Sequence, residues 1–165
     1  MSVQTMPPIT ALLHTMNDGL RLARALEMLL PCAELLIVDH DSGDGTRRIA
    51  REYGARMVAA DGRVRENHYL DLARHEWIFC MEPRESISES LQASLFEWST
   101  HPSESMSGGA FSVFLREQIG ESWVRTPRPE TRLIPRSWSL WEGRMPAFSA
   151  SAIALEGDLL RFALP

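Results

Sequence analysis

The sequence predicts one α/β domain with a mostly parallel central sheet, helices on both faces and an antiparallel addition towards the C-terminus. Short apolar runs alternate with amphipathic segments through the first hundred residues, which is the pattern of consecutive βαβ units. From about Phe111 apolar and polar residues alternate instead, as in a half-buried antiparallel strand. A chain of 165 residues with 44% hydrophobic residues can bury one core, so we expect one domain.

Four strands are expected in the first half, at residues 9–14, 35–38, 56–59 and 77–81. Most of these segments are short and continuously apolar, as is typical of parallel strands covered on both faces. Residues 35–38 are the most uniformly apolar of the shorter runs, which predicts a place in the centre of the sheet.

Helical periodicity lies between these strands. Residues 20–30 repeat apolar side chains at helical spacing behind Asp18, the expected cap. A second helix begins at Ser42 or Asp44 and ends before Gly54, which suits the left-handed position after a helix. A third, weaker helix covers residues 67–73.

The second half changes in character. The Ser-x-x-Glu spacing of Ser86 and Glu89 has the form of a capping box and predicts a fourth helix that ends near residue 99. After a polar stretch at 101–109 we expect a strand near Phe111, a loop at 125–129 and a short strand at 131–134. The remaining tail is rich in Trp, Met and Phe.

Composition excludes several functions. A formal charge of −5 leaves no broad basic field, which argues against nucleic acid as a partner. All 17 basic residues are arginine, so a Schiff-base lysine and the lysine of a phosphate-binding P-loop are both excluded. Two cysteines, Cys32 and Cys80, are too few for a disulfide framework and suggest a cytoplasmic location. No segment is apolar for long enough to predict a membrane span.

Residues 34–46 carry the main functional signal: an apolar strand leads into a loop with three acids and two glycines. Loops of this kind, at the carboxyl end of a strand and before a helix, hold nucleotides in open α/β sheets. The alternative is structural, because Asp39, Asp41 and Asp44 can also cap a helix and accept hydrogen bonds from turn amides. His40 between two of them does not complete a metal site, since neighbouring side chains on an extended segment point to opposite faces.

The histidines carry no spacing typical of metal ligands. Four of them are expected to be surface groups or local hydrogen-bonding groups: His14, His68, His75 and His101.

Several segments, taken in order, resemble the family 2 glycosyltransferases, including those of lipopolysaccharide-core assembly. They are the first strand with Thr15 and Asn17, the loop after Val38, Asn67 with Trp77-Ile78, Arg-Leu-Ile-Pro-Arg at 132–136, and Trp-Glu-Gly at 141–143. The resemblance runs from Ile9 to about Phe148 and implies the GT-A fold, which binds a nucleotide-sugar. It implies a single domain over residues 1–165, with a nucleotide-binding half at 1–100 and a short acceptor-side half at 101–165.

The resemblance also implies a set of site residues. Asp39 falls on the acid that hydrogen-bonds a uracil-type base, a role that suits a carboxylate because it accepts from a ring N–H. The nucleotide-binding residues implied or retained as candidates are Thr15, Asn17, Asp39, Asp41, Arg65, Asn67, Glu82 and Arg84.

Two departures from the family pattern affect catalysis. The family's Asp-x-Asp-Glu metal motif reads Glu82-Pro83-Arg84-Glu85 here, and the fixed positive charge of Arg84 repels a divalent metal. No metal site is therefore expected, and Mg²⁺ or Mn²⁺ would bind only if Glu82 still coordinates it. The family's His-Glu base after the glycine is replaced by Pro146 and Ala147, which cannot accept a proton. Replacement bases would be Glu85, Glu142 or Asp158.

Three functions follow from these departures. The first is a glycosyltransferase-like protein that binds a nucleotide or nucleotide-sugar with weak or no transferase activity. The second is an active, metal-independent hexosyl transferase in which Arg84 grips the diphosphate. The third is a non-enzymatic interaction module, such as a homodimer, formed through Trp138, Trp141 and Phe148; ordinary packing is the alternative for these side chains.

Overall fold

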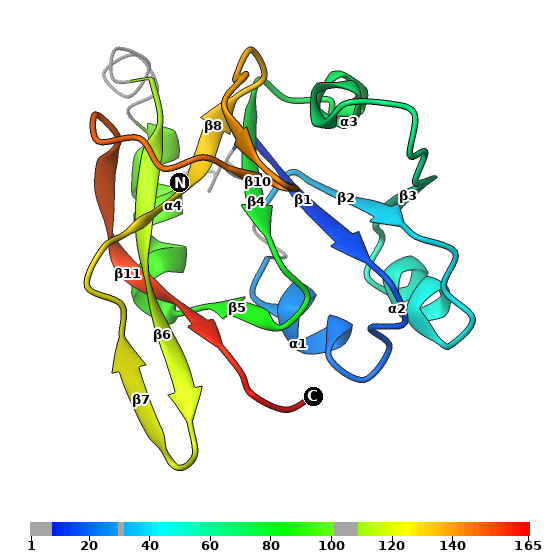
Figure 1. Cartoon of the computed structure of the whole chain (residues 1–165), viewed down its shortest axis with the longest axis horizontal. Helices are drawn as coiled ribbons and strands as arrows, with labels where there is room; N and C mark the ends of the chain where they lie inside the picture. The colour runs from blue at the N-terminus through cyan, green and yellow to red at the C-terminus, as the bar shows by residue number, and fades with distance from the viewer. Residues whose placement is uncertain (1–7, 30–31, 101–108) are drawn as a thin grey trace, which may run out of the picture.

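The computed structural model describes residues 8–29, 32–100 and 109–165 of the chain (Figure 1). The helices are α1 (Leu22–Glu27), α2 (Thr46–Glu52), α3 (Glu66–Leu72) and α4 (Glu89–Thr100). The strands are β1 (Ile9–Thr15), β2 (Glu34–Asp39), β3 (Arg56–Ala59), β4 (Trp77–Met81), β5 (Glu85–Ile87), β6 (Phe111–Ile119), β7 (Ser122–Arg125), β8 (Glu130–Pro135), β9 (Trp141–Glu142), β10 (Met145–Pro146) and β11 (Ile153–Arg161).

A nine-stranded sheet runs through the whole domain in the order β3-β2-β1-β4-β8-β6-β11-β5, with β7 paired to β6. The first four strands in this order are parallel, and β8 joins them antiparallel to β4. This arrangement confirms the predicted α/β class with its parallel part and its antiparallel addition. The prediction that β2 lies in the centre of the sheet was wrong. It lies between β1 and the edge strand β3.

Side-chain alternation along the strands separates two hydrophobic layers. Residues such as Leu13 and Ile37 pack with α1, α2 and α4 on one face, which holds the larger part of the core. Residues such as Leu12 and Val38 face α3 on the other side, together with the β9–β10 hairpin. The predicted helices on both faces are therefore present.

Helix α1 begins without the predicted side-chain cap. The Asp18 carboxylate accepts instead from the Met16 amide and from Arg21 Nε, both at 2.8 Å. Only the Asp18 backbone carbonyl meets the start of the helix, where it accepts from the amide of Leu22 at 2.9 Å. The expected end of this helix, at residues 30–31, lies outside the described residues.

Helix α4 begins later than the capping-box pattern predicted. Ser86 belongs to β5, where it pairs with Leu160 of β11. The residue that caps α4 is Ser88, whose Oγ accepts from the Leu91 amide at 3.1 Å. The pattern was misread because a serine stands at both positions, and strand pairing decides which of them precedes the helix. Of the polar stretch predicted at 101–109, residues 101–108 lie outside the described residues.

Strand β11 is the one long element that the sequence did not predict. It runs parallel to β6 and antiparallel to β5, with a register shift around Gly157. Gly157 has a φ of 102°, and a Cβ there would lie 2.2 Å from the Leu91 amide nitrogen. Glycine is therefore required where the bulged strand passes the start of α4. Figure 1 also shows the β6–β7 hairpin projecting from the rest of the sheet. None of the described helices is long and apolar enough to cross a lipid bilayer.

Candidate functional site

The loops that follow β1 and β2 are joined by hydrogen bonds at the carboxyl edge of the parallel strands. The Asn17 amide donates to Ser42 Oγ at 3.0 Å, and the Gly43 amide donates back to Asn17 Oδ1 at 2.8 Å. The Asp18 amide donates to Thr46 Oγ1 at 2.9 Å. Two loops that are distant in sequence therefore form one platform.

The same platform depends on a small residue at position 19. The Gly19 amide donates to Asp44 Oδ2 at 2.9 Å, and a Cβ at this position would lie 2.8 Å from that oxygen. The Thr46 amide also donates to Asp44, at 2.9 Å. Hydrogen bonds from Thr46 lower the pKa of Asp44. The predicted capping acid thus supports the start of α2, from one position before the N-cap residue Gly45.

Asp39 is buried and fully engaged within the protein. Its Oδ1 accepts from the hydroxyls of Thr15 and Ser42, and its Oδ2 accepts from the Ser42 amide and from Arg47 Nε. Burial raises the pKa of Asp39, but the hydrogen bonds from Ser42, Thr15 and Arg47 outweigh it, so the pKa lies below its usual value. In this structure Asp39 therefore holds the loops together, as the structural reading of the acids predicted.

Two residues of the platform adopt left-handed backbone conformations. Asn17 has a φ of 54° and Asp41 a φ of 52°. Asn and Asp tolerate this region better than other non-glycine residues, and such conformations gather at binding sites. The Asp41 side chain is fully exposed and its nearest cation is Arg47, at 3.4 Å. The sequence thus placed Thr15, Asn17, Asp39 and Asp41 correctly at one edge of the sheet.

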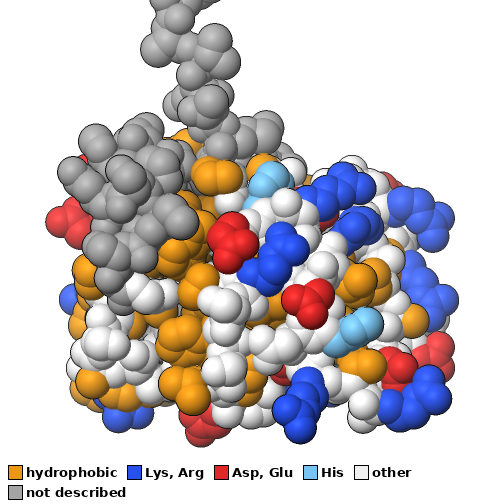
Figure 2. Space-filling view, turned by 90° about the horizontal axis from the view of Figure 1, so that it is seen from above, with side chains coloured by type: hydrophobic (Ala, Val, Ile, Leu, Met, Phe, Trp, Pro, Cys, Tyr) orange, Lys and Arg blue, Asp and Glu red, His pale blue; other side chains and the backbone are white. Residues whose placement is uncertain are grey.

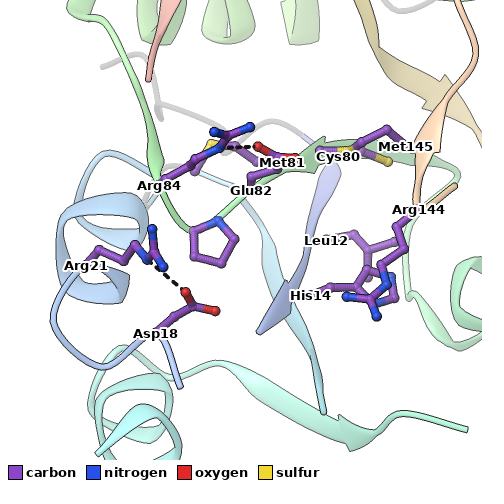
Figure 3. Close-up of a pocket in the computed structure, with 11 residues that line it drawn as sticks. Leu12, His14, Asp18, Arg21, Cys80, Met81, Glu82, Arg84, Arg144 and Met145 are labelled. Carbon is purple, nitrogen blue, oxygen red and sulfur yellow. Dashed lines mark hydrogen bonds and ion pairs between the residues drawn. The ribbon is translucent and has the colours of Figure 1, made fainter. Parts of the chain in front are cut away.

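A cavity of about 260 Å³ opens beside this platform, at the carboxyl ends of β1 and β4 (Figure 3). Its walls come from the β1 strand and loop, the segment after β4 and the turn between β9 and β10. Figure 3 shows Arg21 and Asp18 on one side, Leu12, His14 and Arg144 on the other, and Glu82 and Arg84 above. The remaining lining residues are Cys80, Met81, Pro83 and Met145.

The three arginines of this cavity differ in their partners. Arg21 pairs with Asp18 at 2.8 Å and Arg84 pairs with Glu82 at 2.7 Å. Arg144 is exposed, and within the described part of the chain its side chain is recorded with no carboxylate partner, only with His40 Nδ1 at 3.5 Å. The predicted residues Glu82 and Arg84 therefore line the cavity, together with two cations that the sequence did not single out, Arg21 and Arg144.

A histidine chain is formed by Glu66, His14, His40 and Arg144, of which His14 and Arg144 line the same cavity. His14 Nε2 lies 2.9 Å from Glu66 Oε2, and His14 Nδ1 lies 2.8 Å from His40 Nε2. Arg144 completes the chain at His40 Nδ1. Desolvation, and then the charges of Arg144 and His14, lower the pKa of His40, so its neutral form is favoured near pH 7.

A second network, the arginine–glutamate cluster of Glu85, Arg132 and Arg161, lies under the Glu82–Arg84 segment. Arg132 binds both oxygens of Glu85, at 2.7 and 2.9 Å, and Arg161 Nη2 lies 2.8 Å from Glu85 Oε2. Glu85 is 0% exposed and Arg132 is 1% exposed. Burial raises the pKa of Glu85, but the charge of Arg132 and its hydrogen bonds lower it further than burial raises it.

The predicted role of Glu85 as a base does not suit this geometry. A buried carboxylate held by two guanidinium groups is a poor proton acceptor and cannot reach a bound hydroxyl. Glu85 accepts, in addition, the amide of Glu82 at 2.9 Å, which fixes the segment that carries Arg84. Its observed role is therefore to position that segment.

The residues at the metal position of the resembling family do not fit a divalent cation. Glu82 Oε2 lies 2.7 Å from Arg84 Nε and 3.8 Å from Arg161 Nη2. Glu85 is taken up by the arginine–glutamate cluster. The one carboxylate left at this position already faces two permanent cations, which repel a divalent ion.

The Asn67 side chain holds β9 and the segment before it. Its Oδ1 accepts from Trp141 Nε1 at 2.9 Å, and its amide nitrogen donates to the Trp138 carbonyl. Both tryptophans are partly buried against the α3 face of the sheet. Phe148 is 42% exposed and carries the Arg128 guanidinium over its ring at 4.1 Å. Packing within the domain thus accounts for the two tryptophans, and a homodimer stays a prediction.

The other candidate residues are scattered around the site. Arg65 is exposed at the start of α3. Glu142 lines a second cavity, of about 410 Å³, which shares Glu82 and Met145 with the first. Asp158 pairs with Arg116 and Arg125 on the β6 side of the sheet, where it lines neither of these two cavities.

Positive and negative side chains are interspersed on the face shown in Figure 2, which carries no broad basic field among the described residues.

The histidine chain was missed because it depends on strand register. His14 of β1 pairs with Val38 of β2, so His14 and His40 point to the same face of the sheet. Alternation along two neighbouring parallel strands was the signal that could have found them. Glu66 and Arg144 come from distant segments, and no local pattern links them to this pair.

Comparison with known proteins supports the fold and a likeness to glycosyltransferases. No family model matches the chain. An uncharacterized glycosyltransferase of Rickettsia felis is 31% identical over 91 residues, which are 53% of this chain and 32% of that protein. A second, from Rickettsia bellii, is 31% identical over 88 residues, covering 51% and 30%. The matched part is thus about a third of the length of these curated relatives.

Solved structures show the same fold. The crystal structure of S. aureus TarS 1–349 aligns with a TM-score of 0.53 and 14% identity, over 92% of this chain and 57% of TarS. The complex of TarS 1–349 with UDP aligns over 70% of this chain and 37% of TarS, with a TM-score of 0.46 and 17% identity. The predicted GT-A-type fold is confirmed. The chain is glycosyltransferase-like, and its place in family 2 stays a prediction.

Proposed function

We propose that this chain is a family 2 glycosyltransferase-like protein of the lipopolysaccharide-core type, which binds a nucleotide or nucleotide-sugar and has weak or no transferase activity. The observation that supports it most is the cavity at the carboxyl ends of β1 and β4, which Arg21, Arg84 and Arg144 line. Ligands of open α/β sheets bind at this edge, and guanidinium groups suit phosphate.

The platform loops would receive the nucleoside next to this cavity. A third cavity, of about 330 Å³, lies at the ends of β2 and β3, and its lining includes Asp39, Asp41 and Arg47. Arg47 is half-exposed, so a base can displace its contact with Asp39 without opening the core. Asn17 and Asp41 are already fixed in left-handed conformations, which lowers the cost of ordering the loops when a ligand binds.

Weak activity follows from the groups around the cavity. General base catalysis is commonly worth about 10²–10⁴ in rate. Of the described carboxylates that line this cavity, Asp18 pairs with Arg21, and two arginines contact Glu82. Glu85 beside them is buried and bound by Arg132 and Arg161. Pro146 and Ala147 stand where the resembling family has its base.

Titration calorimetry with UDP, GDP, CDP and dTDP and their sugars tests the binding proposal, at protein concentrations of about 1 mM, where even a Kd in the millimolar range gives heat. UDP is the first probe because Asp39 resembles an acid that binds uracil-type bases, and TarS has been crystallised with UDP. Heat should be lost in Arg84→Gln and retained in Arg48→Gln, a matched exposed arginine outside the cavity. No heat with any of these ligands, with or without Mn²⁺, would overturn the proposal.

A second candidate is a metal-independent transferase. It is favoured by the two cavities that meet at Glu82 and Met145, because a donor in one and an acceptor in the other would be neighbours. Arg84 would stabilise the leaving diphosphate, and Glu142 would serve as base. Release of nucleoside diphosphate from a nucleotide-sugar in excess chelator measures this activity. Equal turnover by Arg84→Ala would rule out the mechanism.

The third candidate, an interaction module, rests on fewer observations. The two tryptophans nominated for an interface already have partners within the domain. Light scattering distinguishes a monomer from a homodimer, and a monomer at high protein concentration would remove this candidate.

A further inference from the structure

The hydrogen bonds of the histidine chain have only one consistent direction when both imidazoles are neutral. Glu66 can only accept and Arg144 can only donate. His14 therefore donates from Nε2 to Glu66 and accepts at Nδ1, while His40 donates from Nε2 to His14 and accepts from Arg144 at Nδ1. The single position in the chain that is open to another proton is His40 Nδ1, next to the cavity wall.

Arg144 at the end of this chain is held weakly. Its contact with His40 is long, at 3.5 Å, and within the described residues no acid is recorded against its guanidinium. The other two arginines of the cavity are paired with Asp18 and Glu82. Arg144 is therefore the cation of the cavity that an incoming anion can engage without breaking an ion pair.

We propose that Arg144 of the cavity wall and the neighbouring His40 form an anion subsite at the edge of the cavity, which holds a phosphate group of the ligand, and that His40 takes up one proton when the anion binds. That this phosphate belongs to a nucleotide rests on the proposed function. The subsite itself requires only an anion with two or more acceptor oxygens.

Protonation of His40 changes the chain in a defined way. The new proton on Nδ1 turns the acceptor of Arg144 into a donor, so that Arg144 and His40 both point N–H groups outward. His40 Nε2 keeps donating to His14, and Glu66 at the far end stabilises the positive charge. The bound anion then meets two charge-assisted donors in place of one.

The charges that face His40 come from four elements. Arg144 from the β9–β10 turn and His14 from β1 disfavour its protonation, while Asp39 of β2 and Glu66 of α3 favour it. Together with desolvation they lower the pKa of His40 in the free protein, and a bound dianion reverses this balance. Binding should therefore strengthen as pH falls from about 8 to about 6, the range in which histidine titrates.

Calorimetry in two buffers with different ionisation enthalpies, at the same pH near 7, measures the proton uptake. UDP-glucose is the probe, because its diphosphate diester does not titrate in this range. The observed binding enthalpy should differ between the two buffers, because the buffer supplies the proton that His40 takes up and the two buffers differ in their ionisation enthalpy. The difference should vanish in His40→Gln and persist in His68→Gln, a control at an exposed histidine of α3. Arg144→Gln should bind about tenfold or more weakly, as expected for a lost charge-assisted bond.

A second measurement needs no nucleotide and no variant of His40. The His40 ring signal is followed by NMR against pH, with and without sulfate, an anion that stays doubly charged over this range. Sulfate should raise the His40 pKa in the native chain and leave it unchanged in Arg144→Gln.

The outcomes separate the two proposals. Binding of UDP-glucose without proton uptake would overturn the subsite and leave nucleotide binding standing. A sulfate-dependent His40 pKa without heat from any of the nucleoside diphosphates or their sugars would support the subsite and contradict the nucleotide function. If sulfate does not move the His40 pKa, the subsite is overturned.

Discussion

The arginine–glutamate cluster and the histidine chain both join acids to bases, yet they have opposite properties. In the cluster, Glu85 is fully buried and each of its oxygens meets a guanidinium group, which stabilises its ionised form. In the histidine chain, His14 and Glu66 are about 10% and 14% exposed, and the last member, Arg144, lies in solvent. Saturated partners and full burial make a network structural, whereas an open end and a titratable ring leave it able to respond to a ligand.

The largest effect should come from Glu85→Gln. The amide keeps the shape of the side chain but removes the charge that compensates Arg132, and breaking a buried pair costs about 3–5 kcal/mol. Urea denaturation followed by circular dichroism measures the free energy of unfolding. Glu142→Gln, at an exposed acid, should change it by less than about 0.5 kcal/mol. A loss below about 1 kcal/mol in Glu85→Gln would show that the cluster does not carry the stability assigned to it here.

The second-largest effect should be a loss of unfolding free energy in acid, caused by protonation of Glu85. The folded pKa of Glu85 lies below its unfolded value of about 4.3, so its contribution is complete above that pH and is lost as pH falls through the folded pKa. Unfolding free energy measured between about pH 5 and pH 2 should fall more steeply in the native chain than in a Glu85→Leu, Arg132→Met double variant. Equal slopes would assign acid unfolding to other carboxylates.

The same chemical change in the histidine chain should be mild. In Glu66→Gln an amide oxygen can still accept from His14 Nε2, and no buried charge is left alone, so the loss should stay below about 1 kcal/mol. Urea denaturation under the conditions used for Glu85→Gln allows the losses of unfolding free energy in the two variants to be compared directly. Similar losses in the two variants would break the distinction between a structural and a responsive network.

The smallest effect is a shallow pH dependence from His40. Its folded pKa lies below its usual value, so its contribution is present above the unfolded pKa of about 6.5 and is lost as pH falls through the folded pKa. Unfolding free energies between about pH 7.5 and pH 5 should vary less in His40→Gln than in the native chain. His68→Gln is the control that should keep the native slope, and the same flattening there would contradict the role of His40.

Sequence patterns predicted most of the parallel half of the fold and the edge at which the site lies. Apolar runs define β1, β2 and β4 because strands covered on both faces admit little else. Strand β11 was missed because Glu156, Gly157 and Asp158 interrupt its alternation at the bulge. Local patterns carry no trace of such an irregularity.

The candidate site was predicted in part. The resemblance located the loops with Asn17 and Asp39 and the segment with Arg84, which all lie at one edge. It also assigned Asn67 to the nucleotide, which stays a prediction; in the structure the Asn67 side chain holds Trp138 and Trp141. The pairing of His14 with His40 required the register of β1 and β2, which the composition of either strand leaves open.

The route of β11 sets the order in which the domain can be completed. Residues 85–87 find their strand partner only in residues 159–161, more than seventy positions later. Arg161, which balances Glu85, arrives with the same strand. During synthesis on the ribosome, Glu85 beside the turn that carries Arg84 can thus pair with Arg132 first, and gains its second guanidinium only after β11 has emerged. Contacts between residues so distant in sequence slow folding. This edge of the sheet should therefore be the part of a nascent chain that most needs protection by chaperones.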